Sequence, residues 1–270
     1  MNIKLPSPRQ MLSKPPKPAP EEDTDVEVVS DGEELRMSLL GHLDELRRRL
    51  TKAALGLIVG VVFGVMFAAP VFEFLLEPYG RQVQILDPTG SVTSYFRVSL
   101  LIGGVIASPL ITYQLMMFVL PGLTRRERRF VLMALPAITL LFLIGILFSW
   151  FLLIPPALNF LATFQSNIFI VEWTADGYLG FVTALLFWMG VAFETPLVFF
   201  VISLLGMVNA GALLRNWRIA IIGASVAAAF ITPTIDPVNM FLVMAPLLSL
   251  YMISIVLVAI GQRFYQRSIN

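Results

Sequence analysis

The sequence of 270 residues contains no cysteine and a single histidine, His42. Without cysteine there is no disulfide, no thiolate metal site and no cysteine nucleophile. One histidine leaves little scope for a histidine-built metal site or a serine–histidine–aspartate triad. The G-x-x-x-x-G-K-[ST] signature of a nucleotide-binding loop is also missing from the sequence. We therefore expect a protein that is not an enzyme and that holds neither a metal nor a cofactor.

Charged residues are also scarce: they make up 14% of the chain, whereas 57% is apolar. This composition lies outside the range of water-soluble domains and inside that of multi-spanning membrane proteins. No run alternates as a barrel strand would, and only helices satisfy their backbone hydrogen bonds within each crossing segment. The prediction is an all-α, polytopic membrane protein with six transmembrane helices, at about 51–69, 97–120, 131–154, 178–206, 218–232 and 238–260.

The positions of the 19 lysines and arginines predict the orientation. All but Arg81 and Arg97 precede or begin span 1, lie between spans 2 and 3 or between spans 4 and 5, or follow span 6. By the positive-inside rule, both termini are cytoplasmic.

Unequal span lengths are the second topological feature. Span 5 has about 14 apolar residues, roughly 21 Å of helix against a hydrocarbon core of about 30 Å. It is joined to span 6 by the tight "TPTIDPVN", so we predict a short pair of helices. The segment "IPPALNFLATF", from Ile154 to Phe164, predicts a short amphipathic helix between spans 3 and 4.

Three regions follow from these assignments. Residues 1–35 divide into a proline-rich basic part and an acidic part with little apolar content, and we predict a disordered cytoplasmic extension. Residues 36–265 form the membrane domain, and residues 266–270 a cytoplasmic tail.

The stretch "HLDELRRRL" enters span 1. Asp44 with Arg48 and Glu45 with Arg49 are i,i+4 pairs with the acid first, the favourable order on a helix. Spacing alone predicts a solvated, self-paired helix start.

The stretch "LPGLTRRERRF" enters span 3. Thr124 followed three residues later by Glu127 predicts a capping box for this span. Glu127 also lies among four arginines at the membrane surface, where it could exchange partners with an incoming cation.

Glu194 is the one ionisable residue between Leu179 and Met207, in "GVAFETPLVFF". It lies roughly 20 Å from the cytoplasmic end of span 4 and roughly 24 Å from the outer end. A charge at this depth costs at least about 2.5–3.5 kcal/mol, which favours a functional role over structural helix–helix bonding.

Asp236, in a turn framed by prolines, is better explained by turn chemistry.

Four stretches in this order, "HLDELRRRL", "SPLITYQLMMFVLPGLTRRERR", "FETP" and "TPTIDP", resemble the TatC family, the core subunit of the twin-arginine protein translocase. The resemblance covers about residues 38–265. It implies a concave, cup-like bundle in the bacterial inner membrane. Its function would be that of a receptor for twin-arginine signal peptides of folded precursors. It would self-associate and assemble with the single-span TatA and TatB for export driven by the proton-motive force.

The resemblance also implies roles for single residues. Glu45 and Glu127 match acidic residues that engage the arginine pair, and Phe118 matches an aromatic residue of the same site. Glu194 matches a polar residue that faces a partner transmembrane helix. Supporting positions are Arg47, Thr124, Arg126, Pro78, Pro109 and Asp236. The long N-terminal extension and the spacing within "TPTID" depart from the family pattern.

Two other functions stay open at this point. A proton-coupled secondary transporter would use Glu194 as its coupling carboxylate. A membrane scaffold without a substrate would use its arginine-rich loops for topology alone.

Overall fold

The computed structural model describes residues 31–79, 83–119, 125–168, 172–204, 206–234 and 236–269. The chain divides into two compact units, Met1–Leu43 and Asp44–Asn270. Helix α1 begins in the first unit at Asp31, inside the segment predicted to be disordered. The remainder of that segment, residues 1–30, lies outside the described residues.

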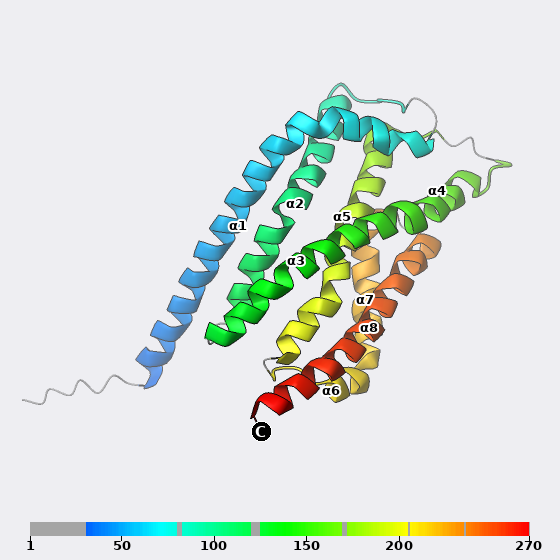
Figure 1. The fold of residues 1–270 in the computed structure, drawn as a ribbon. Coiled ribbons are helices and arrows are strands. Elements are labelled where there is room, and N and C mark those ends of the chain that lie inside the picture. Colours follow the sequence, from blue (N-terminus) through cyan, green and yellow to red (C-terminus); the bar gives the residue numbers. More distant parts are fainter. Residues whose placement is uncertain are drawn as a thin grey trace, which may run out of the picture. The chain divides into compact units, whose positions relative to one another are not determined.

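The described part of the chain is helical, and its one β-contact is an isolated bridge between Gln84 and Thr174. Five helices are long and apolar enough to cross a membrane, and a sixth apolar helix is shorter. This confirms the all-α, polytopic prediction. The long helices are α1 (Asp31–Leu76), α2 (Gly90–Val119), α3 (Arg125–Phe148), α5 (Ala175–Leu204) and α8 (Pro237–Ile269), and the short one is α7 (Trp217–Ile231) (Figure 1).

Helix lengths correct two expectations. Spans 5 and 6 were predicted to form a short pair of helices. Helix α7, which corresponds to span 5, is short, with 15 residues, but α8, which corresponds to span 6, has 33. Helix α2 begins at Gly90, seven residues before the predicted span, because its first turns carry polar residues that hydropathy does not count. The crossing of the membrane by all six helices, the cytoplasmic termini and the concave shape stay predictions.

The amphipathic helix predicted after span 3 is confirmed as α4 (Ile154–Thr163). It continues α3 through a π-helical turn, η3 (Ser149–Leu153), in which the Ile154 N–H donates to the Ser149 carbonyl. Pro155 and Pro156 have no N–H to offer the carbonyls four residues earlier, so they suit the first turn of a new helix.

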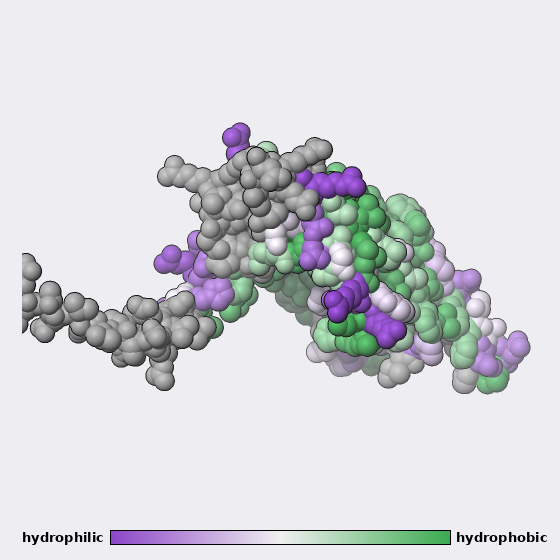
Figure 2. Space-filling model, turned by 90° about the horizontal axis from the view of Figure 1, so that it is seen from below, coloured by the Kyte–Doolittle hydropathy of each residue, from purple (hydrophilic) through white to green (hydrophobic). Residues whose placement is uncertain are grey.

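Helix α5 is the central helix of the second unit and packs against α2, α3, α7 and α8 (Figure 1). Its buried side chains, among them Leu179, Val182 and Met189, belong to the largest apolar core. By contrast, α1 exposes a run of large apolar side chains, which in a bilayer meet lipid rather than water. Figure 2 shows apolar side chains on the flanks and hydrophilic ones on the end that it views.

Helices α1 and α2 approach each other through glycines. A Cβ on Gly60 would lie 2.5 Å from the Gly103 carbonyl oxygen, and one on Gly103 would lie 2.6 Å from the Val61 nitrogen. Small residues at such contacts are what allow membrane helices to pack closely. The contacts Gly56 to Leu110, Gly60 to Gly103 and Gly64 to Ser99 make the two helices antiparallel.

We predict that Gly60→Ala lowers the free energy of unfolding by about 1–3 kcal/mol, because its methyl group meets backbone that cannot move aside. Thermal unfolding of the purified protein in detergent measures this. The matched control is Gly223→Ala on α7, where an added Cβ has nothing within 4 Å. Equal midpoints for the two variants would contradict the close packing of α1 on α2.

Candidate functional site

Glu194 is buried in α5, with 8% of its surface exposed. The Thr112 hydroxyl of α2 donates a hydrogen bond of 2.9 Å to its carboxyl group. No ion pair joins Glu194 to a cation within the described residues. The carboxyl group thus has a neutral hydrogen-bond donor from a neighbouring helix, a partner that the sequence did not reveal.

The α2 segment around Thr112 is unusually polar for a buried membrane helix. Ser108, Thr112 and Gln114 are each less than 9% exposed. Pro109 lacks the N–H that would bond the Val105 carbonyl, and the Ser108 hydroxyl donates to that carbonyl at 3.0 Å instead. The Val105 carbonyl therefore keeps a hydrogen-bond donor although Pro109 cannot supply one.

Glu45 is half-buried in α1 and forms the ion pair with Arg49 that its spacing predicted, at 2.5 Å from Nη2 to Oε1. The companion prediction is wrong: Asp44 approaches Arg47, at 3.9 Å, rather than Arg48. Both side chains of this second pair are largely exposed, with 84% and 76% of their surface accessible. On the solvated face of a helix, the i,i+3 and i,i+4 partners compete at nearly equal energy.

The remaining residues of the expected peptide site are only partly described. Phe118 is half-buried near the end of α2. Arg126 and Glu127 lie in the first turn of α3, but their side chains lie outside the described residues, as does the whole of Thr124. The predicted capping box therefore stays a prediction.

Asp236 caps helix α8, which confirms the interpretation as turn chemistry. Its carboxylate accepts the Asn239 backbone N–H at 2.7 Å and the Asn239 side-chain amide at 3.0 Å, with Pro237 as the first helical residue. Desolvation by itself would raise the pKa of Asp236, but hydrogen bonds to its carboxylate, those from Asn239 foremost, together outweigh desolvation and lower the pKa below its usual value. Pro78, the other supporting proline, lies exposed in a 3₁₀ turn, η2 (Glu77–Tyr79), after α1.

A second polar contact joins α2 to α5, and no sequence pattern predicts it. Arg97 donates from Nη1 to the Asp176 carboxylate at 2.9 Å and to the Asp176 carbonyl at 2.7 Å. The Tyr178 hydroxyl of α5 donates to the Leu75 carbonyl of α1 at 2.9 Å. The end of α1 and the beginnings of α2 and α5 are thus tied together. The positive-inside rule predicts only that Arg97 lies on the outer side.

Among the described residues, no cluster of three or more histidine, aspartate or glutamate side chains could hold a metal ion. Apolar helices of spanning length, a buried carboxyl group and arginine-rich helix ends define the chain as a polytopic helical membrane protein. Residues 41–246 match the family described as Sec-independent protein translocase protein, TatC. The chain belongs to the TatC family and is a component of a protein translocase.

Relatives and solved structures agree with this assignment. TatC of Synechocystis sp. is 38% identical over 81% of this chain and 87% of its own length. The chloroplastic TATC of Pisum sativum is 34% identical. The match covers 84% of this chain and 64% of the pea protein. A crystal structure of the twin-arginine translocase receptor TatC, 35% identical, superposes with a TM-score of 0.73 over 82% of this chain and all of that one.

We predict that Asp236→Ala lowers the free energy of unfolding by about 1 kcal/mol through loss of the helix cap. Because the folded-state pKa is below the unfolded one, the charge of Asp236 stabilises the fold fully above about pH 4, the ordinary range of an aspartate. This charge-dependent stabilisation is lost as the pH falls through the lowered pKa of Asp236. Asp236→Asn keeps one oxygen for the Asn239 N–H but loses the acceptor for the Asn239 side-chain amide, so it should remove the pH-dependent part and cost less than Asp236→Ala at neutral pH. Unfolding midpoints between pH 3 and pH 7 measure both, and identical profiles for the three proteins would contradict this role.

Proposed function

We propose that this chain is a receptor for twin-arginine signal peptides of folded precursor proteins in the bacterial inner membrane. It binds them at its cytoplasmic face, self-associates in a complex with TatB, and assembles with TatA for export driven by the proton-motive force. The six-helix domain spans residues 36–265, with both termini in the cytoplasm. Membership in the TatC family supports this role, as does the similarity to a solved twin-arginine translocase receptor.

The observation that carries the proposal is the state of Glu45. Its carboxylate already binds a guanidinium, that of Arg49, in a partly exposed i,i+4 pair. Such a pair contributes only about 0.3–0.5 kcal/mol, so an incoming arginine can displace Arg49 at small cost. The planar guanidinium of arginine engages a carboxylate through two parallel hydrogen bonds, which a lysine cannot form.

The packing of α1 against α2 supports a shared site. Successive contacts pair Gly64 with Ser99, Gly60 with Gly103 and Gly56 with Leu110. Continued toward the start of α1, this antiparallel register brings Glu45 to the level of Phe118. The connection from α2 to α3 is short, so Glu127 lies at the same end. Glu45, Phe118 and the first turn of α3, which carries Glu127, therefore lie at one end of these helices, and such a set would suit two adjacent arginines followed by an apolar segment.

We expect Glu45→Ala and Glu127→Ala each to abolish photocrosslinking of a twin-arginine precursor while leaving membrane insertion intact. The matched control is Glu73→Ala, which removes an exposed carboxylate from the far part of α1. Normal precursor crosslinking in both site variants would refute the site. Loss of crosslinking in the control as well would show a general requirement for negative charge instead.

We also propose that Glu194 contributes to the docking surface for a single-span partner helix. Thr112 satisfies part of its hydrogen-bonding capacity but supplies no compensating charge. A partner helix that offers a polar side chain can replace or supplement this bond, which in a membrane is worth about 1–2 kcal/mol.

For Glu194, the expected result is that Glu194→Leu abolishes crosslinking to the partner helix and Glu194→Gln preserves it, because the amide keeps hydrogen-bonding capacity. Thr112→Val, which removes the internal donor alone, should leave partner crosslinking at or above the wild-type level. Equal loss in the Gln and Leu variants would show that the carboxylate acts through its charge. Unchanged crosslinking in the Leu variant would exclude Glu194 from docking.

A further inference from the structure

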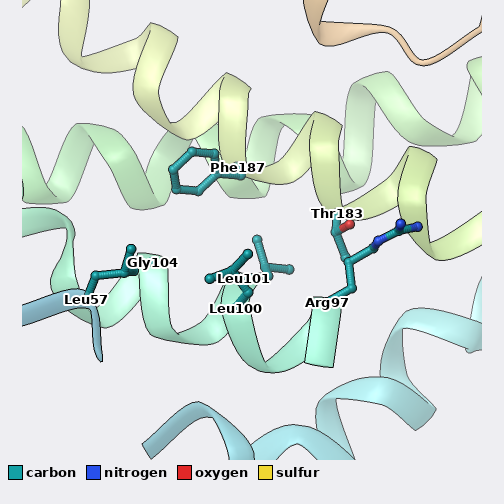
Figure 3. A pocket seen from close by; sticks show the side chains of 7 residues that line it. All are labelled: Leu57, Arg97, Leu100, Leu101, Gly104, Thr183 and Phe187. Carbon is teal, nitrogen blue, oxygen red and sulfur yellow. The ribbon is translucent and has the colours of Figure 1, made fainter. Parts of the chain in front are cut away.

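A pocket of about 230 Å³ lies between α1, α2 and α5, away from the residues assigned to the signal peptide. Its apolar lining comes from Leu57, Leu100, Leu101, Gly104 and Phe187, and Figure 3 shows these residues on the three helices around the pocket. The volume is below the range of about 300–1,000 Å³ that encloses a drug-sized ligand. The lining selects an apolar, flexible group rather than a polar solute.

The surroundings of the pocket decide what can enter it. Leu100 lines the pocket and has 52% of its surface exposed, so the pocket reaches the surface of the protein. The neighbouring surface side chains Phe96 and Ile58 are 58% and 60% exposed and equally apolar. In a membrane-spanning bundle, such a surface faces acyl chains, so the group available at the opening is a lipid tail.

Arg97 adds a charged group to the pocket lining. It lies seven residues after the start of α2, about 10 Å along the helix axis, where a long side chain reaches the headgroup region. The recorded hydrogen bonds of its guanidinium use Nη1, which leaves the donors on Nη2 and Nε for a ligand. Gly180 makes room for this arrangement, since a Cβ there would lie 2.5 Å from Nη1.

Asp176 determines the charge pattern of the ligand. The Asp176 carboxylate lies 2.9 Å from the Arg97 guanidinium, and the Asp176 side chain is 52% exposed, so an accessible negative group stands beside the arginine that lines the pocket. A purely anionic headgroup would be attracted to Arg97 but repelled by the negative charge of Asp176. A headgroup with a phosphate and an ammonium pairs with both.

We propose that this pocket binds one phospholipid with a phosphoethanolamine headgroup. One acyl chain occupies the apolar pocket, the phosphate accepts hydrogen bonds from Arg97, and the ammonium pairs with Asp176. The site depends on the membrane location of the chain and not on the signal-peptide site, so either proposal can fail without the other.

Native mass spectrometry of the purified full-length protein tests this with three added lipids of identical acyl chains: phosphatidylethanolamine, phosphatidylglycerol and diacylglycerol. We expect phosphatidylethanolamine to bind about tenfold more tightly than diacylglycerol, the difference that a charge-assisted headgroup contact makes. Asp176→Asn should reverse the preference between the two phospholipids, because the remaining cation then favours the anionic headgroup. Phosphatidylglycerol binding to the wild type as tightly as phosphatidylethanolamine would overturn the proposal.

Two variants that fill the pocket locate the binding site. Leu57→Trp and Leu100→Trp should each lose one bound phospholipid, whereas Ile58→Trp, on the exposed face next to Leu57, should keep it. Lipid retention in either folded pocket variant equal to that in the control would overturn the assignment.

A photoreactive residue in place of Leu100 should capture lipid in membranes that contain a twin-arginine precursor. Capture of the signal peptide instead would make the pocket part of the peptide site and overturn the proposal.

Discussion

Close approach of helix backbones is the constraint on which this structure depends. Between helices in lipid there is no hydrophobic driving force, so contact energy comes from packing at short range and from interhelical hydrogen bonds. Gly60 and Gly103 join α1 to α2, Gly145 and Gly190 lie where α3 meets α5, and Gly261 of α8 lies against Ser203 of α5. Helix α5 takes part in two of these three contacts, which is why it can sit in the centre and present Glu194 to α2.

The helices were predictable because the bilayer dictates a minimum length and apolarity, and five of them are long and apolar enough to cross a membrane. Their ends were not predictable from hydropathy. Helix α2 starts at Gly90 and α8 runs on to Ile269 because backbone hydrogen bonds continue through polar residues that project beyond the apolar layer. The join between α3 and α4 was missed for a related reason: a π-turn before Pro155 continues the helix where proline suggests a break.

The candidate site also contains some residues that the sequence predicts and others that it does not. Glu194 and Asp236 could be identified from sequence, because a carboxylate in an apolar run and an aspartate before proline each carry a local signature. Thr112 and Asp176 could not, since a threonine and an aspartate near helix ends are ordinary. Their partners lie 82 and 79 residues away in the chain. Only the register of α2 against α5 brings these pairs together, and that register is set by packing that no single sequence displays.

The two polar contacts between α2 and α5 explain why a pocket exists between them. Arg97 binds Asp176 near the beginning of both helices, and Thr112 binds Glu194 about 22 Å further along α2, so the helices run parallel and are held at two points. Leu100, Leu101 and Gly104 lie between these points and face Thr183 and Phe187 of α5 across the pocket. The two contacts differ in kind. Arg97 and Asp176 compensate each other's charge, whereas Thr112 gives Glu194 only a hydrogen bond, which another donor can replace. If a partner helix replaces the Thr112 hydrogen bond to Glu194, as we propose, the Arg97–Asp176 contact and the pocket beside it stay in place.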